Sequence, residues 1–435
     1  MKPTACFLAA FFLASTLFAA DAWSTPSEQQ IDAVYPQMRL LYEDLHRNPE
    51  LSFHEEKTAV TIAAQLRKLG YEVSTNIGGT GVVGVLKNGP GPTVMIRAEL
   101  DALPVLEKTG LPYASHVTTH SDDRVEVPVM HACGHDLHMS VGMGTAALLA
   151  QNKDRWRGTF IYVGQPAEER ISGAIAMLKD GLFTRFPKPD YVFAIHDTSF
   201  APAGKVAYVA EYAMSNADSV DVTIYGKGGH GSAPQVTVDP IVIAARTILA
   251  WQTIVSRENN PQDPAVITVG TIHGGTKNNI IPDDVKLQLT VRSYKDDVRR
   301  HLLAAIERIA DAEAAAAGAE KKPKVTVFEG VSAVYNDPAL TERIVGALEP
   351  VLGKGNVVQG APMMASDDFA EYGRAGVPSV MLSLGAVNPA KFEAAQKSGE
   401  ALPGPHSSLF APEEETSLRT GILVETSAVL ELLRK

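Results

Sequence analysis

Residues 93–101, TVMIRAELD, combine a short apolar, β-branched run with two acidic residues at its end. The run from Thr93 to Ala98 follows a Gly-Pro turn, and this pattern is typical of a strand that is buried on both faces. Glu99 and Asp101 then fall just past the carboxyl end of the strand. The same order, an apolar strand followed by polar side chains, recurs along the chain and indicates the fold class.

Strands and helices alternate on both sides of this stretch. Apolar runs at 81–86, 159–164 and 191–195 are expected to be strands, and apolar helices are expected at 139–150 and near Ile175. This alternation predicts an α/β fold with a mainly parallel sheet that is covered by helices on both faces. Ligands bind outside the carboxyl ends of the strands in such sheets. The side chains expected to converge there are Asp101, Glu168, Glu169 and His196.

A second unit begins near Tyr212, where the pattern changes to strand, helix, two strands, helix and strand. This order is typical of an α+β domain with an antiparallel sheet, of the ferredoxin-like kind. We expect an inserted domain at 212–325, and a catalytic domain that is assembled from residues 23–211 and 326–435.

The N-terminal segment differs from the rest of the chain. Lys2 precedes an apolar run over 5–18, which is followed by the small residues AADA. This order is typical of a secretory signal peptide, here residues 1–22, with cleavage after Ala20 or Ala22. The run is shorter than the roughly 20 residues that span a bilayer, so a retained membrane anchor is the weaker alternative. We expect an exported protein, periplasmic or secreted, with no membrane contact after cleavage.

Composition favours small-molecule chemistry. The chain has 435 residues, of which 45% are hydrophobic and 20% charged, as expected of a globular protein with two domains. A net charge of -11 offers no basic surface for nucleic acid or an anionic membrane. Of the two cysteines, Cys6 belongs to the expected signal peptide. Cys133 would then be alone in an oxidising compartment, where metal ligation protects a thiolate.

Cys133 lies in the segment HACGHDLH, residues 131–138, which gathers a thiol, three imidazoles and a carboxylate. Thiolate and neutral imidazole suit a zinc-like ion, and Gly134 lets the backbone bend so that Cys133 and His135 face the same point. The alternative interpretation is a reduced cysteine beside polar residues at the start of a helix. The segment by itself supplies only part of a metal site.

Further donors lie elsewhere in the chain. The pair Glu168-Glu169 offers one carboxylate to a metal ion and a second as general base, although such a pair is also common at a solvated helix start. His196 ends an apolar strand, where a histidine is as often a core residue as a ligand. His406 lies in a late Gly-Pro-His-Ser turn and is a weak indication when taken alone.

The motifs together resemble the metal-dependent aminoacylase/carboxypeptidase family. The resemblance is to its amidohydrolase branch, which contains hippurate hydrolases and the plant hydrolases of indole-acetyl amino acids. Matching motifs cover essentially the whole mature chain, in the expected order. They are RAELDALP (97–104), MHACGHD (130–136), QPAEE (165–169), GKGGHGSAP (226–234), NIIPD (279–283), SDDF (366–369) and PH (405–406).

The resemblance implies a two-metal site with Glu168 as the general base and Asp101 as a supporting residue that orients the cluster. The Cys133 thiolate would be shared between the two ions. Glu99 stands where the family usually has an aspartate, and it is left unassigned. Asp136 and His138 are expected to orient the ligands rather than bind metal. The implied metal ligands are Cys133, His135, Glu169, His196 and His406.

The inserted domain would act as a lid and a dimerisation domain. His230 matches a lid histidine that reaches a substrate carbonyl oxygen across the interface of a homodimer, where it would stabilise an oxyanion. Asn279 and Arg292 match positions expected to contact substrate, the arginine through a carboxylate. The glycine-rich stretch 226–231 also fits a dinucleotide pattern, but Pro234 follows where a phosphate-binding helix would run.

These observations predict an exported metal-dependent amidohydrolase that cleaves the amide bond of N-acyl amino acids. Zinc or manganese is the expected metal, with cobalt and nickel as further possibilities. A dipeptidase or carboxypeptidase of the same fold is the principal alternative. A cysteine hydrolase that uses Cys133 and His135, and a non-catalytic binding protein, are weaker alternatives.

Overall fold

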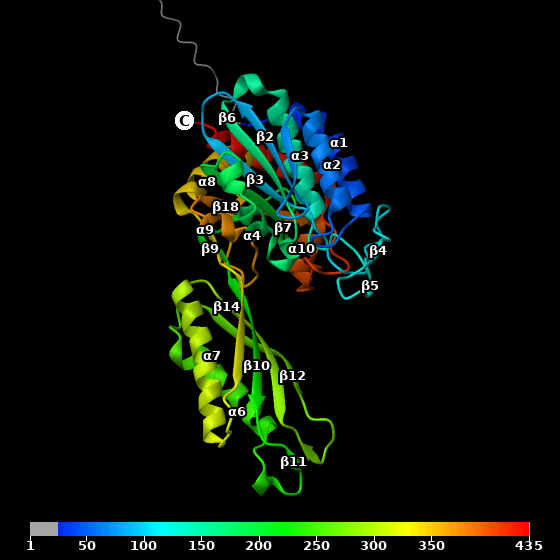
Figure 1. Ribbon diagram of the computed structural model, residues 1–435. Helices are drawn as coiled ribbons and strands as arrows, with labels where there is room; N and C mark the ends of the chain where they lie inside the picture. Colours follow the sequence, from blue (N-terminus) through cyan, green and yellow to red (C-terminus); the bar gives the residue numbers. More distant parts are fainter. Residues whose placement is uncertain (1–24, 435) are drawn as a thin grey trace, which may run out of the picture.

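The computed structural model describes residues 25–434, so the expected signal peptide at residues 1–22 lies outside the described residues. The chain forms a larger catalytic domain and a narrow second domain that projects from it (Figure 1). We refer to the second domain as the lid.

The catalytic domain is built on an eight-stranded sheet. Its central strands β6, β3, β7 and β18 are mutually parallel, whereas β1, β2 and β6 pair antiparallel at one side. The predicted mainly parallel sheet is therefore confirmed. In spatial order the strands are β1 (Glu72–Ile77), β2 (Gly81–Asn88), β6 (Gly158–Gln165), β3 (Thr93–Glu99), β7 (Tyr191–Pro202), β18 (Ser379–Val387), β8 (Val206–Tyr208) and β17 (Val357–Gln359).

Helices cover both faces of this sheet, as predicted, and each face has its own apolar core. On one face lie α1 (Glu28–Arg47), α2 (Glu56–Lys68), α3 (His135–Gln151), α8 (Pro338–Leu352) and α11 (Glu414–Leu432). On the other lie α4 (Gly173–Lys179), α5 (Leu182–Arg185) and α9 (Ala370–Arg374). The remaining elements are the exposed helix α10 (Pro389–Ser398), the hairpin of β4 (Thr118–His120) and β5 (Glu126–Pro128), and the pair β9 (Glu211–Met214) and β16 (Val334–Asn336).

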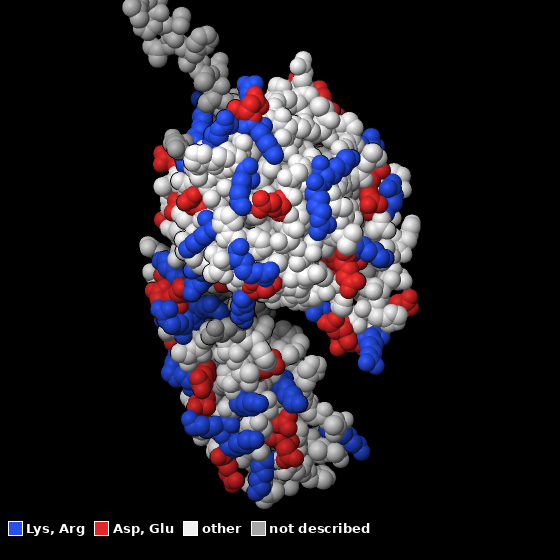
Figure 2. All heavy atoms as spheres, turned by 45° about the horizontal axis from the view of Figure 1, so that its top comes forward, with Lys and Arg blue, Asp and Glu red and all other residues white. Residues whose placement is uncertain are grey.

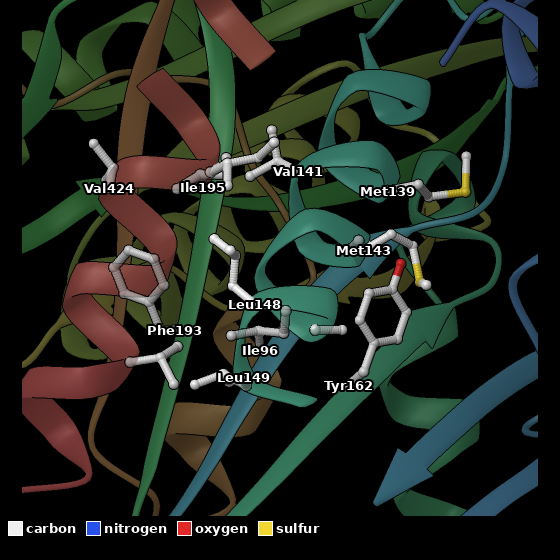
Figure 3. Close-up of a cluster of buried hydrophobic side chains, with 14 of the residues drawn as sticks. Ile96, Met139, Val141, Met143, Leu148, Leu149, Tyr162, Phe193, Ile195 and Val424 are labelled. Atoms are coloured by element: carbon white, nitrogen blue, oxygen red, sulfur yellow. The ribbon is translucent and has the colours of Figure 1, made fainter. Parts of the chain in front are cut away.

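Helix α3 is buried on all sides because it lies between the sheet and the helices α1 and α11. Figure 3 shows Phe193 and Ile195 of β7 projecting towards Leu148 of α3 and Val424 of α11. A helix that is apolar all round is expected only in such a sandwiched position. This packing fixes the N-terminus of α3, which carries the metal-ligand motif, against the carboxyl ends of the strands.

The lid has the predicted ferredoxin-like order of strand, helix, two strands, helix and strand. Its antiparallel sheet has the order β12-β14-β10-β15, and two helices pack on one face over a third apolar core. A short pair, β11 and β13, forms the tip (Figure 1). The elements are β10 (Asn216–Tyr225), β11 (Gly229–His230), α6 (Pro240–Thr253), β12 (Ala265–Gly274), β13 (Ile280–Ile281), β14 (Asp284–Ser293), α7 (Asp296–Ala316) and β15 (Lys324–Val331).

The predicted lid boundary at residue 325 is wrong, because β15 continues to Val331 and pairs there with Ala217 of β10. Glycine at 330 allows this close approach, since a Cβ there would overlap the Ala217 carbonyl oxygen. Because glycine has no apolar side chain, this position interrupts the alternation of apolar and polar residues. The sequence pattern therefore does not show where the strand ends. At the other boundary, residues 211–214 form β9, which pairs with β16 and not with the lid sheet.

Acidic and basic side chains alternate over the visible surface of both domains (Figure 2). Within residues 25–434, no helix combines the length and the apolar character that a membrane span requires.

Candidate metal centre

The carboxyl ends of β3 and β6 and the middle of β7 bring the predicted donors together, because β7 continues past the expected end at 195 to Pro202. The Nε2 atom of His135 lies 3.9 Å from Oε2 of Glu168 and 4.0 Å from Oε1 of Glu169. Cys133 Sγ lies 3.6 Å from Nε2 of His196. The convergence expected from three separate strand ends is therefore observed in the fold.

Gly134 allows the backbone to turn sharply between Cys133 and His135, at the start of α3. Its φ of 73° lies in the left-handed region, where a side chain is strained. A Cβ at this position would also overlap the carboxylate of Asp197 in β7. Glycine is thus needed for two reasons, namely its backbone conformation and its close contact with Asp197.

The late turn that contains His406 joins this cluster through the backbone. The His406 N–H donates to the Ala132 carbonyl over 2.7 Å, and its ring Nε2 lies 3.4 Å from Oε2 of Glu169. His406 has a φ of 70°, an uncommon conformation for a residue with a side chain. A contact between segments so distant in sequence explains why this histidine is a weak indication from sequence alone.

Cys133 lies at the centre of the arrangement. Its Sγ belongs to two groups whose donor atoms all lie within 4.8 Å of one another, one with His135 and His196, the other with Glu169 and His406. The thiolate, imidazole and carboxylate donors of these two overlapping groups would suit two neighbouring divalent cations.

The ring tautomers also fit metal ligation. Nδ1 of His135 lies 2.8 Å from the Asp101 carbonyl oxygen, and Nδ1 of His196 lies 2.8 Å from the Asp197 carbonyl oxygen. Each Nδ1 therefore donates its proton to the backbone, which leaves the Nε2 lone pair directed at the cluster. Within the described chain, the buried atoms His135 Nε2 and Glu169 Oε1 have no hydrogen-bond partner. Unpaired buried donors and acceptors are costly, and divalent cations would satisfy these two.

Burial raises the pKa of the Cys133 thiol well above its ordinary value, and the neighbouring imidazole of His135 offsets this only in part. A thiol in this environment stays protonated unless a cation binds the sulfur. The same direction of shift disfavours the alternative in which Cys133 is an activated nucleophile paired with His135.

Glu168 is a buried carboxyl group beside the cluster. Burial, followed by repulsion from Asp367 and Glu169, raises its pKa well above the ordinary value. A carboxylate with a raised pKa is a better proton acceptor, which is the property required of a general base.

Asp101 orients the two glutamates through the backbone. Its carboxylate accepts hydrogen bonds from the N–H groups of Glu168, over 3.2 Å, and Glu169, over 3.0 Å, and from the Ser52 hydroxyl, over 2.6 Å. The supporting role expected for Asp101 is consistent with these contacts, since Asp101 holds the turn at Glu168 and Glu169 and also contacts His135.

Beneath the cluster lies a buried ionic network that the sequence analysis did not identify. The Arg97 guanidinium pairs with Glu99, with Asp367 over 2.6 Å and with Asp368 over 3.2 Å. Glu99 also accepts from Nδ1 of His138 over 2.9 Å. A charged residue inside the apolar run TVMIRAE is the signal that could have predicted such partners, because a buried charge has to be paired.

The other side chains of the segment 131–138 have partners outside the cluster. The Asp197 N–H donates to Nε2 of His138 over 2.8 Å, and Asp136 lies 2.6 Å from Nδ1 of His46. His131 is buried. These contacts agree with the expectation that Asp136 and His138 support the ligands.

The structure places the three lid residues at opposite ends of the lid. His230 and Asn279 lie together at the exposed tip, where the Gly231 N–H donates to the Asn279 carbonyl over 2.9 Å. Arg292 lies at the other end of β14 and donates to the Met364 carbonyl over 2.7 Å. At about 3.4 Å per residue, the length of β14 separates these two groups by roughly 30 Å.

A parallel sheet that presents thiol, imidazole and carboxylate donors at its carboxyl ends, together with an inserted α+β lid, defines a two-domain metal-dependent hydrolase. The chain belongs to the family described as Peptidase family M20/M25/M40, whose model matches residues 95–396. It is a hydrolase that acts on amide bonds.

Relatives and solved structures agree with this assignment. The chain is 37% identical to thermostable carboxypeptidase 2 of Saccharolobus solfataricus, over 90% of this chain and 94% of the relative. It is 39% identical to the hippurate hydrolase of Campylobacter jejuni, over 75% of this chain and 82% of the relative. The crystal structure of the Bacillus subtilis YXEP protein, described as a dinuclear metal binding peptidase, is similar with a TM-score of 0.75 and 27% identity, covering 93% of this chain and all of that one.

Proposed function

We propose that the protein hydrolyses the amide bond of N-acyl amino acids with two divalent metal ions. The observation that carries this proposal is the shared position of Cys133 in two groups of donors, with the buried carboxyl group of Glu168 beside them. The similarity to a hippurate hydrolase supports the substrate class. The proposed ligands are Cys133, His135, Glu169, His196 and His406, and zinc or manganese is the proposed metal, with cobalt and nickel as alternatives.

When bound, the metal ions would polarise the substrate carbonyl and lower the pKa of the attacking water. Glu168 takes a proton from this water and later delivers it to the nitrogen of the leaving amino acid. Asp101 keeps Glu168 and Glu169 in place through their backbone N–H groups. Arg292 would pair with the substrate carboxylate. Asn279 lies at the far end of the same lid, so it would contact this substrate only from the lid tip of a partner subunit.

A homodimer formed through the lid would complete the site. The exposed side of α6 carries Val242, Ala245 and Leu249 at helical spacing, and β12 is an edge strand of the lid sheet. An apolar helix stripe beside an open sheet edge is a surface that a second copy would cover. The partner subunit would then bring its own lid tip, with His230, to the oxyanion.

We also propose export through the signal peptide at residues 1–22. The order of charge, apolar run and small residues supports this proposal. Mass measurement of the mature protein from its host should find the N-terminus at Asp21 or Trp23. Recovery of the intact N-terminus would contradict it.

A substrate panel tests the activity. Protein reconstituted with each metal in turn should hydrolyse N-acetyl and N-benzoyl amino acids faster than free dipeptides, and a chelator should abolish turnover. Faster hydrolysis of dipeptides or of peptide C-termini would favour the second candidate, which the carboxypeptidase relative supports. Activity that survives chelation but not an alkylating agent would indicate a cysteine hydrolase. Metal-loaded protein that turns over no substrate would indicate a binding protein.

A further inference from the structure

We infer that an apolar recess beside the metal centre receives the side chain of the amino acid that the reaction releases. This inference rests on the proposed function and names the substrate preference of that site. The recess has a volume of about 360 Å³ and lies between β7, β8, β17 and β18 and the loop 360–363. An apolar cavity of about 150 Å³ is enough to hold benzene, so an aromatic side chain can be accommodated.

Strand alternation connects the recess with the cluster. His196 and Thr198 lie two residues apart on β7 and therefore point to the same face of the sheet. Ser383 of β18 pairs directly with His196 in the parallel register, so it shares this face. Both Thr198 and Ser383 line the recess. The recess consequently opens on the side of the sheet where the imidazole of His196 meets Cys133.

The position of Arg292 decides which part of the substrate enters. Its guanidinium donates to the Met364 carbonyl, over 2.7 Å, directly after Met363, which lines the recess. In an N-acyl amino acid the carboxylate and the side chain branch from the same carbon, whereas the acyl group lies beyond the scissile amide. A substrate whose carboxylate pairs with Arg292 therefore places its side chain, and not its acyl group, next to Met363.

The lining predicts the chemical class of that side chain. None of the residues that line the recess carries a charge, so a charged side chain would lose its hydration there without gaining a partner. Met214, Met363 and Met381 are flexible and polarisable and can adapt to different apolar shapes. Phe200, at the rim, is 77% exposed and would be covered by a bound apolar group. Leucine, methionine and phenylalanine derivatives should be preferred over those of glutamate or lysine.

Two substitutions with opposite effects on the volume of the recess test the inference. Ala207→Leu places three more carbons in the recess, and Met363→Ala enlarges it. Ala390→Leu, on the exposed helix α10, is the matched control for the first. The value of kcat/KM is measured for N-acetyl derivatives of glycine, alanine, leucine, phenylalanine, tryptophan and glutamate. A second series keeps alanine constant and varies the acyl group from acetyl to hexanoyl and benzoyl.

We expect Ala207→Leu to lower kcat/KM for N-acetyl-phenylalanine by about 10-fold or more, with N-acetyl-glycine changed less than about twofold. Met363→Ala should raise activity on the tryptophan derivative, so this variant carries the test if Ala207→Leu does not fold. Changes confined to the acyl series, or an unchanged preference in both variants, would overturn the inference. A wild-type protein that hydrolyses none of these substrates would instead overturn the proposed function.

Discussion

The metal centre and the lid tip differ in what one chain supplies. At the centre, the five proposed ligands come from four separate segments of one chain; Cys133 and His135 are buried, Glu169 and His196 are half-buried, and His406 is exposed. At the tip, His230 and Asn279 are exposed, and Nδ1 of His230 lies 2.7 Å from the hydroxyl of its near neighbour Ser232. One region is preorganised by packing, whereas the other presents its functional groups to something outside its own domain.

On the proposed function, this difference gives the two domains separate roles. Imidazole donors whose rings are held by hydrogen bonds, as those of His135 and His196 are, bind metal with little reorganisation, which suits a centre that stays intact between turnovers. An oxyanion donor on a separate domain can arrive with the substrate and leave with the product. The centre should therefore be sensitive to changes within one chain, and the tip to the presence of a partner.

The largest effect is expected at Glu168. Glu168→Gln keeps the shape of the side chain but cannot accept the proton, so kcat should fall by about 10²- to 10⁴-fold while metal content stays unchanged. Glu169→Gln is the matched control, because the neighbouring glutamate is a proposed ligand and its loss should lower the metal content itself. Kinetics combined with elemental analysis distinguishes the two. Near-normal turnover by Glu168→Gln would remove it from the mechanism.

A smaller loss is expected at the tip. His230→Ala should lower kcat by about 10²- to 10³-fold with full metal content, as is typical of a missing oxyanion donor. Mixing His230→Ala chains with Glu168→Gln chains then tests the partner directly. Random dimers would contain one intact site in each mixed pair, which restores about a quarter of the wild-type activity. If the lid instead closes on its own chain, mixing restores nothing.

Gly134 tests the preorganisation of the centre. Gly134→Ala puts a Cβ at positive φ and against the Asp197 carboxylate, so we expect about 2–4 kcal/mol of lost stability and weaker metal binding. Gly346→Ala, in the middle of α8, has open space around its Cβ and should be neutral or stabilising by up to about 1 kcal/mol. Chemical denaturation of both variants, with and without metal, gives the comparison. If Gly134→Ala and Gly346→Ala were equally stable, a side chain at residue 134 would cause no strain at the start of α3.

Most of the fold could be predicted because its signals are local. The apolar runs that end in Asp101, Glu168 and His196 are strands, and their alternation with helices sets the parallel sheet and the edge where ligands converge. The lid boundary could not be predicted in the same way. Its last strand ends in a stretch held by the pairing of Val331 with Ala217, a contact that no local pattern reports.

The sequence predicted that the candidate donors converge, but not the ionic network beneath them. Arg97 lies among apolar neighbours, and its partners Asp367 and Asp368 are about 270 residues away in sequence. The place of Glu99, between Arg97 and His138, likewise follows only from the fold. A local motif shows which residue types can bind a metal ion. The charged residues that support those ligands come together only through tertiary contacts.

A pH-dependent effect is expected where the start of α3 is anchored. His46 is buried between Asp136, which lies 2.6 Å from its Nδ1, and Glu107, which lies 3.1 Å from its Nε2. Burial alone would lower the pKa of His46, but Asp136 and then Glu107 outweigh it and raise the pKa to about 10. Because the folded value exceeds the ordinary 6.5, the stabilisation is complete below about pH 6.5 and is lost as the pH rises towards 10.

The free energy of unfolding should therefore fall with rising pH over that range, by at most about 1.4 kcal/mol per pH unit from this one proton. His46→Gln should be less stable at pH 6 and should lack this part of the slope, whereas His301→Gln on the exposed surface of the lid helix α7 should keep it. Denaturant titrations of metal-free protein at several pH values measure the slope without interference from ligand binding. An identical slope in wild type and His46→Gln would mean that the buried imidazole is neutral, and that packing alone holds the metal-binding end of α3.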